Sequence, residues 1–142
     1  MNKENNVFYW LPCSVVFVST AHEEKRDIMT ATAMFVSEKE PLLVISVAKD
    51  HLTEKLIMQS GKFTLVIAGV DQEKLAMQVG SAKGEDTDKF ERFAIKASPG
   101  AVGAALVPDG AAAWMACEVE SSSEIKGYRL FIGRVVDQKD TG

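Results

Sequence analysis

Two short runs of hydroxyl and alanine residues are the part of this sequence best suited to chemistry. Residues 30–33 read Thr-Ala-Thr-Ala, and residues 46–49 read Ser-Val-Ala-Lys, shortly before His51 and Thr53. Hydroxyl and backbone N–H groups bind phosphate oxygens, and alanine side chains let a flat ring approach the backbone. A lysine and a helix N-terminus beside them add positive potential. The pattern suits a planar ligand that carries a phosphate, although strand alternation that ends in a helix cap produces the same residues.

Composition and the remaining motifs disfavour other kinds of site. The chain has 142 residues and a formal net charge of −4, so no basic surface for nucleic acid is expected. No Gly-x-Gly-x-x-Gly run follows a strand, and neither a P-loop nor a Gly-x-Ser-x-Gly elbow occurs. The two histidines, His22 and His51, are far apart and belong to no cluster with metal-ligand spacing. We therefore expect no metal site and no nucleic-acid partner.

The start of the chain and its cysteines bear on location and redox chemistry. The first six residues are polar and Pro12 interrupts the short apolar stretch after them, which predicts neither a signal peptide nor a membrane span. We expect a cytoplasmic protein without a membrane partner. Cys13 and Cys117 form no Cys-x-x-Cys pair and lie in apolar stretches. Buried thiols that pack as small hydrophobes are therefore expected, rather than redox or metal-binding cysteines.

More of the chain reads as strand than as helix. Strands are predicted where β-branched and aromatic residues run together or alternate with polar ones, at residues 14–20, 42–47, 63–67, 113–120 and 128–136. Gly127 and Gly133 suggest a bend or bulge in the last of these. Short helices are predicted at 53–60, capped by Asp50 or Thr53 and ended by Gly61, at 72–79, ended by Gly80, and at 87–93. Residues 98–113, rich in glycine, proline and alanine, suit a long loop.

These elements predict the architecture. Few helices separate the strands, and the last two strands follow each other directly, so a mainly β, mostly antiparallel barrel with short peripheral helices fits better than a parallel α/β sheet. No repeat and no break in composition divides the chain. A single domain over residues 1–142 is expected.

Six segments in order resemble the flavin reductase-like and flavoredoxin-like proteins. Residues 28–33 are similar to the family's Met-Thr-Ala-x-Ala signature, 41–47 to its Pro-Pro-Leu-hydrophobic-Ser segment and 51–57 to its aromatic-Thr-x-x-Leu-Ile helix. Residues 61–65 are similar to the Gly-x-Phe-x-Val strand, 88–90 to the Asp-Lys-Phe turn and 130–136 to the Phe-Ile-Gly-Glu-Val-Val strand. The resemblance covers nearly the whole chain.

The resemblance implies a split β-barrel, a homodimer and FMN held near the subunit interface. Carried over by residue, the backbone and side chains around residues 29–32 would face the isoalloxazine ring, while Ser46, Lys49 and Thr53 would hold the phosphate. Lys89 is a weaker candidate, because a solvated lysine at a helix end is at least as common. Trp10 and Trp114 could stack on a ring, although aromatic residues in apolar strands more often belong to the core. The cofactor-binding set is Met29, Thr30, Ala31, Thr32, Ser46, Val47, Ala48, Lys49, Thr53 and Lys89.

Two departures from the family's pattern bear on the electron donor. Family members that use NADH commonly carry Gly-Asp-His before the last strand, where this chain reads Lys126, Gly127 and Tyr128. The family's Ser-Gly-Arg-Asp turn is altered at residues 81–86, Ser-Ala-Lys-Gly-Glu-Asp. Three functions stay open: a flavin reductase or related oxidoreductase with NAD(P)H as transient donor, an FMN-containing electron carrier with a small-molecule or protein redox partner, and a cofactor-free barrel that serves as an interaction module. No catalytic residue is assigned.

Overall fold

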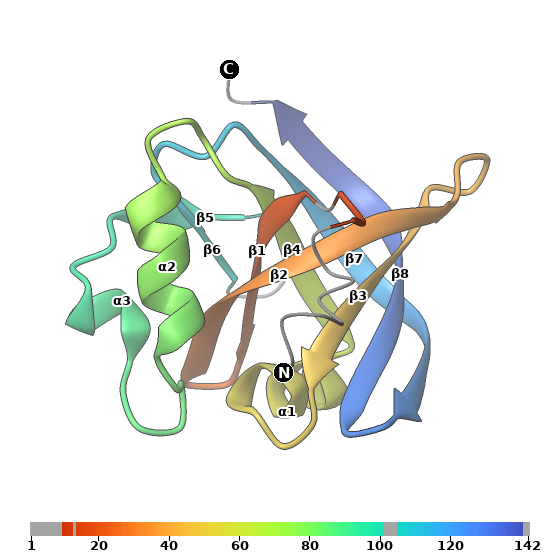
Figure 1. Cartoon of the computed structure of the whole chain (residues 1–142), viewed down its shortest axis with the longest axis horizontal. Helices are drawn as coiled ribbons and strands as arrows, with labels where there is room; N and C mark the ends of the chain where they lie inside the picture. Colours follow the sequence, from red (N-terminus) through yellow and green to blue (C-terminus); the bar gives the residue numbers. More distant parts are fainter. Residues whose placement is uncertain (1–9, 13, 101–104, 141–142) are drawn as a thin grey trace.

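The central feature of the fold is a closed barrel of six antiparallel strands in the order β1-β2-β3-β8-β7-β4 (Figure 1). The computed structural model describes residues 10–12, 14–100 and 105–140. The mainly β, antiparallel architecture predicted from the sequence is confirmed. The strands are β1 Val15–His22, β2 Lys25–Ser37, β3 Leu42–Ala48, β4 Lys62–Ile67, β5 Ala97–Pro99, β6 Leu106–Pro108, β7 Ala113–Ile125 and β8 Tyr128–Asp140. The helices are α1 Leu52–Ser60, α2 Glu73–Ser81 and α3 Lys89–Arg92.

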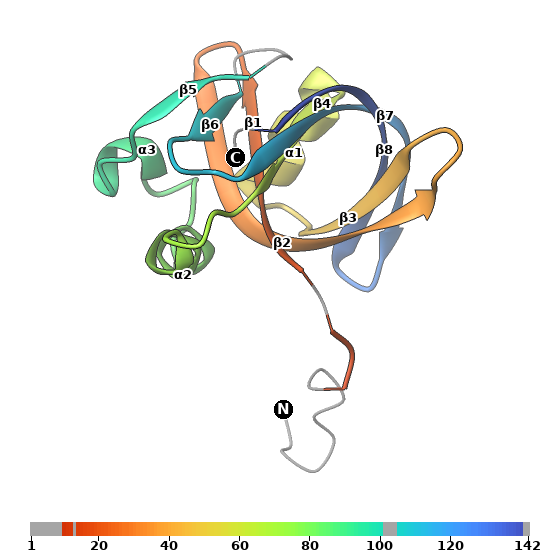
Figure 2. The ribbon, with the colours of Figure 1, turned by 90° about the horizontal axis from the view of Figure 1, so that it is seen from above.

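Two hydrophobic clusters share the wall formed by β1, β2 and β4. The inner cluster fills the barrel with residues such as Val18, Ile45 and Phe131. The outer cluster packs the opposite face of the same wall against α2, α3 and β6, with Phe17 and Ile28 at its centre. Figure 2 shows α2, α3, β5 and β6 together on one side of the barrel. Strand β1 is therefore buried on both faces, which explains its nearly continuous apolar run.

The helices are placed as predicted, with three differences at their ends. Helix α1 packs against β1 and contributes Ile57 to the inner cluster, and Gly61 ends the helix in the left-handed conformation. Its N-cap is His51, without a side-chain hydrogen bond, so the prediction of Asp50 or Thr53 as cap is wrong. Helix α2 continues through Gly80 to Ser81, and α3 is a single turn whose N-cap, Asp88, accepts from the Phe90 N–H.

The segment predicted as one long loop carries local order. Strands β5 and β6 form a two-stranded sheet at 97–99 and 106–108, and Val107 and Ala111 are buried in the outer cluster. The loop prediction for 98–113 is wrong for these parts, because small apolar residues there pack against the barrel. Residues 101–104 and Cys13 lie outside the described residues.

Two glycines of the β7–β8 hairpin, Gly127 and Gly133, lie where a side chain would be strained or crowded. Lys126 and Gly127 both have positive φ and form its tight turn. Gly133 faces Phe63, and an added Cβ there would lie 2.7 Å from the ring. The expected irregularity is present as register shifts at Ala116/Cys117 and Val119/Ser121. The glycine at 133 makes room for the aromatic ring beside the second shift.

The remaining expectations concern single side chains and membrane spans. Cys117 is buried in the inner cluster, as expected, and burial raises the pKa of its thiol to about 12. Trp114 packs partly buried against the outer cluster, whereas Trp10 is 86% exposed. Among the described residues, no helix is long and apolar enough to cross a membrane.

Candidate functional site

A cavity of about 420 Å³ lies where β2, the end of β3, the start of α1 and the turn after α2 meet. Its volume falls within the range of small-molecule and cofactor sites, about 300–1,000 Å³. Most residues predicted to bind a cofactor line it, and these are Met29, Thr30, Ala31, Thr32, Ser46, Ala48, Thr53 and Lys89. The two runs singled out in the sequence therefore meet at one place.

Strand pairing explains why the hydroxyl residues meet. Strands β2 and β3 are antiparallel, with Ala33 opposite Ile45. Period-two alternation then directs Thr32 and Ser46 to the outer side of the barrel, and both are exposed. Neither of these hydroxyls has a hydrogen-bond partner in the part of the chain that the structure describes. Thr30 differs, because its hydroxyl donates to the carbonyl of Ala76 and ties β2 to α2.

Two of the predicted residues do not line the cavity. Val47 is fully buried in the barrel core, on the opposite side of β3 from Ser46 and Ala48. The ammonium of Lys49 lies 2.7 Å from the carboxylate of Glu124 in the β7–β8 hairpin. This contact raises the pKa of Lys49 and lowers that of Glu124. Lys49 is thus paired with Glu124 at one end of the barrel.

A buried polar cluster centred on Asp27 forms the innermost part of the cavity wall. The Asp27 carboxylate accepts from the Ile28 N–H at 2.9 Å and from the Thr53 hydroxyl at 2.7 Å, and lies 3.2 Å from the Lys89 ammonium. Lys89 is 4% exposed, so it is not the solvated helix-end lysine that the sequence allowed. Gly84 packs against this carboxylate, since an added Cβ would lie 2.5 Å from Asp27 Oδ2. The sequence analysis did not single out Asp27. The local signal for a buried carboxylate was an acidic residue directly before the apolar Ile28.

A lysine, a histidine and a tyrosine complete the rim. Lys83 and His51 line the cavity and are exposed, and neither side chain has an ion-pair partner among the described residues. Glu85 lies near this rim. Burial acts to raise the pKa of Glu85, but hydrogen bonds from backbone groups and the nearby His51 and Lys55 lower it on balance. Tyr128 follows the hairpin turn, pairs with Ala48 and is half exposed at the cavity.

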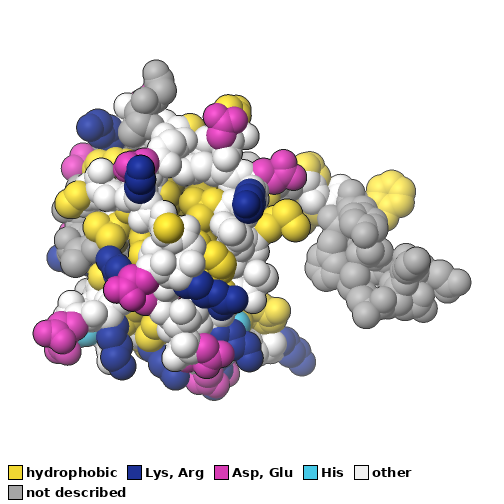
Figure 3. Space-filling model, turned by 90° about the vertical axis from the view of Figure 1, so that its left-hand side faces the viewer, with side chains coloured by type: hydrophobic (Ala, Val, Ile, Leu, Met, Phe, Trp, Pro, Cys, Tyr) yellow, Lys and Arg dark blue, Asp and Glu magenta, His cyan; other side chains and the backbone are white. Residues whose placement is uncertain are grey.

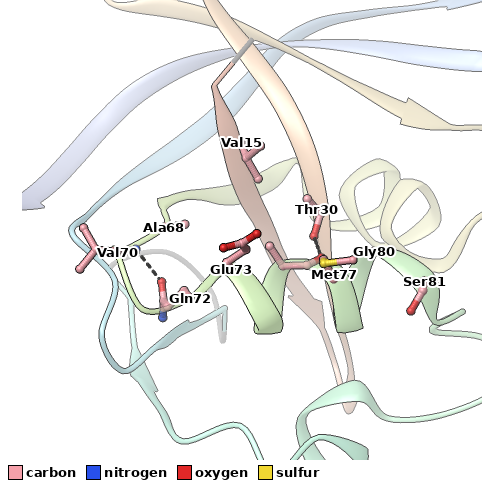
Figure 4. A pocket seen from close by; sticks show the side chains of 11 residues that line it. Val15, Thr30, Ala68, Val70, Gln72, Glu73, Met77, Gly80 and Ser81 are labelled. Carbon is pink, nitrogen blue, oxygen red and sulfur yellow. Dashed lines mark hydrogen bonds between the residues drawn. The ribbon is translucent and has the colours of Figure 1, made fainter. Parts of the chain in front are cut away.

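A second, open cavity of about 680 Å³ adjoins the first and shares Val15, Thr30 and Gly80 with it (Figure 4). Its rim carries exposed apolar side chains, with Val70 99% and Met77 71% exposed. Figure 3 shows that hydrophobic side chains also gather in the centre of the face that carries α2 and α3, between groups of charged residues. The ligand-sized cavity is thus continuous with an apolar surface.

Comparison with known families decides the identity of the fold. The family model described as "Flavin reductase like domain" matches residues 8–140. The chain belongs to this family. It is 37% identical over 116 residues to the uncharacterized protein YddH of Escherichia coli (strain K12), covering 80% of this chain and 61% of that protein's length.

Solved structures agree with the family assignment at the level of the fold. An FMN-binding protein from Thermus thermophilus, with bound 1-cyclohex-2-enone, superposes with a TM-score of 0.87 at 22% identity and covers 99% of this chain and 77% of that one. The NADH:FAD oxidoreductase SgcE6 of Streptomyces globisporus C-1027 gives 0.83 at 22% identity, with 99% and 86% covered.

Both departures from the flavin reductase-like pattern lie at the cavity. Tyr128, from the segment at 126–128 singled out in the sequence, lines it. Ala82, Lys83 and Gly84, from the altered turn, line it as well. In this member of the flavin reductase-like family, the two segments that the sequence analysis singled out as departures therefore border the same cavity.

Proposed function

We propose that this protein binds FMN in the 420 Å³ cavity and serves as a flavin-dependent redox protein that works as a homodimer. The observation that carries the proposal is the convergence of free hydroxyls, small side chains and the exposed Lys83 and His51 on one cavity. Membership of the flavin reductase-like family supports a flavin-related redox role. The FMN-binding protein and the NADH:FAD oxidoreductase of the same fold support a flavin as the ligand.

The residues at the cavity fit the two parts of such a ligand. Thr32 and Ser46 offer unpartnered hydroxyls on the flat outer face of β2 and β3, where Ala48 leaves room for a ring. Lys83 and His51 offer N–H donors for a phosphate at the rim. The flavin would supply the electron-transfer chemistry, and the protein would bind it, orient it and exclude water.

Titration with FMN, riboflavin and FAD tests the cofactor assignment. FMN should bind more tightly than riboflavin by about tenfold or more, because a charged hydrogen bond to phosphate contributes about 1.5–3 kcal/mol. Lys83→Met should narrow this preference. Lys49→Met is the matched control and should change it less, because Lys49 is already paired with Glu124. Absence of binding of any flavin at micromolar concentration would favour the cofactor-free interaction module instead.

The presence of Tyr128 at the cavity favours an electron-carrier role over direct oxidation of NAD(P)H. A histidine at this position could contact the dinucleotide, whereas the tyrosine presents a bulkier, neutral group at the cavity rim. Positioning is most of what a protein contributes to hydride transfer. NADH and NADPH should therefore reduce the bound FMN slowly, while dithionite reduces it readily. Anaerobic stopped-flow bleaching at tens per second, a typical enzymic rate, would support the NAD(P)H oxidoreductase instead.

A homodimer would cover the apolar surroundings of the cavity. Val15 is 53%, Met34 67% and Met77 71% exposed, and the cavities beside β2 open among them. Exposed apolar patches of this kind are typical of interfaces. A second copy across a two-fold axis would place such a patch against its equivalent and would add a wall to the flavin site.

A further inference from the structure

Two ion pairs cross between adjacent residues of β2 and adjacent residues at the start of α3. In the outer pair, Arg26 Nη2 lies 2.9 Å from Asp88 Oδ2, and both side chains are 35% exposed. In the inner pair, Lys89 Nζ lies 3.2 Å from Asp27 Oδ1, and both side chains are 4% exposed. The outer pair lies away from the 420 Å³ cavity, whereas Asp27 and Lys89 both line it.

The Lys89 ammonium has donor capacity left over. It carries three N–H groups. One donates to the carbonyl of Ile28 at 2.7 Å, and another faces Asp27. The described part of the chain supplies no partner for the third, and Lys89 lines the cavity. A cation with a free donor is thus fixed at the wall of the ligand site.

Asp27, in contrast, makes three contacts to the protein. The Ile28 N–H, the Thr53 hydroxyl and Lys89 share its two oxygens, and the backbone at Gly84 packs against it. These contacts hold the carboxylate in place, and Asp27 in turn fixes the position of Lys89. A buried ion pair is a poor source of stability, because apolar residues of similar volume often stabilise a fold as well or better. Because both residues line the cavity, the charges of this pair lie where they can act on a bound ligand.

We propose that Lys89, positioned by Asp27, donates a hydrogen bond to an electron-rich oxygen of the bound flavin, and that the balanced charges of the pair tune its reduction. Asp27 is a positioning residue in this scheme. The proposal rests on the proposed function. Reduction adds electron density to the flavin ring, so an uncompensated cation beside it favours the reduced form and an uncompensated anion favours the oxidised form.

The test compares the affinities of Asp27→Asn, Lys89→Met and the double variant for oxidised and reduced FMN, measured anaerobically. Asp27→Asn should raise the ratio Kd(oxidised)/Kd(reduced) by about tenfold, and Lys89→Met should lower it by about tenfold. Each change corresponds to about 30 mV in the midpoint potential, in opposite directions. The double variant should return to within about threefold of the wild-type ratio while binding oxidised FMN about tenfold more weakly, because the donor is lost.

Arg26→Gln is the matched control, because it breaks the outer pair at the neighbouring position. It should leave the ratio within about twofold of wild type. The proposal is overturned if both single variants shift the midpoint potential in the same direction. It is also overturned if either changes the ratio Kd(oxidised)/Kd(reduced) by less than about threefold. If the single variants do not fold, the double variant decides, since an unchanged affinity for oxidised FMN also overturns it. A wild-type chain that binds neither FMN nor FAD contradicts the proposed function itself.

Discussion

Replacing Thr53 by valine separates the two roles that this hydroxyl could have. The sequence resemblance assigns Thr53 to the phosphate of a cofactor, whereas the structure shows its hydroxyl 2.7 Å from Asp27 Oδ2, in a side chain that is 1% exposed. Valine has nearly the same shape, so the substitution removes the hydrogen bond and leaves little void. If the hydroxyl serves Asp27, stability must fall even when no ligand is present.

The magnitude follows from the charge of the acceptor. A hydrogen bond to a charged group contributes about 1.5–3 kcal/mol. The Ile28 N–H and Lys89 still contact Oδ1, but Oδ2 loses the Thr53 hydroxyl, so a value near the middle of this range, about 2 kcal/mol, is expected. An unfolding entropy of about 2.1 cal/mol/K per residue near 60 °C gives about 0.3 kcal/mol/K for 142 residues. Thr53→Val should therefore lower Tm by about 7 °C.

Urea unfolding and thermal melts of the ligand-free protein measure this effect. Thr32→Val is the matched control, because it makes the same chemical change at an exposed position and should alter the free energy of unfolding by less than about 0.5 kcal/mol. Equal stability of Thr53→Val and wild type would refute the assignment of this hydroxyl to Asp27.

Three further predictions concern other parts of the molecule. Gly84→Ala should lower the free energy of unfolding by about 1–3 kcal/mol in urea, because its Cβ would lie 2.5 Å from the Asp27 carboxylate, and a wild-type value would contradict this packing. In a Cys13→Ser background, Cys117 should resist alkylation at pH 8 unless the protein is unfolded, because its pKa is raised to about 12. Rapid labelling of the native protein would contradict the burial of this thiol. Because the thiol of the unfolded chain ionises at lower pH than that of the folded chain, the free energy of unfolding should fall as pH rises from about 9 toward 12. Sedimentation at low micromolar concentration should give a dimer, and a clean monomer of 15.5 kDa would refute the second wall of the flavin site.

The sequence predicted the barrel and singled out residues that line the cavity, because both follow from local patterns along single strands. The alternation of side chains along β2 and β3 places Thr32 and Ser46 on one side of the barrel. The same alternation argues against Val47, which entered the predicted set as part of the run at 46–49 and which the structure buries in the core. Strand alternation is therefore a better guide than membership of a run to which side chains of a strand can reach a ligand.

The parts that the sequence did not reveal depend on contacts between distant segments. Asp27 pairs with Lys89 only because α3 packs on β2, and Lys49 is engaged only because the β7–β8 hairpin brings Glu124 beside it. Composition also misled at 98–113, where glycine and proline suggest a loop although Val107 packs into the outer cluster. In each case the deciding partner lies far along the chain.

The shared wall between the two hydrophobic clusters has a consequence for cooperativity. Val16 and Val18 belong to the inner cluster and Phe17, between them, to the outer one, so the amides of a single strand report on both. Loosening either cluster exposes one face of β1 and weakens its pairing with β2 and β4. The clusters are thus expected to open together, and hydrogen exchange at Val16, Phe17 and Val18 should share one free energy, close to that of global unfolding.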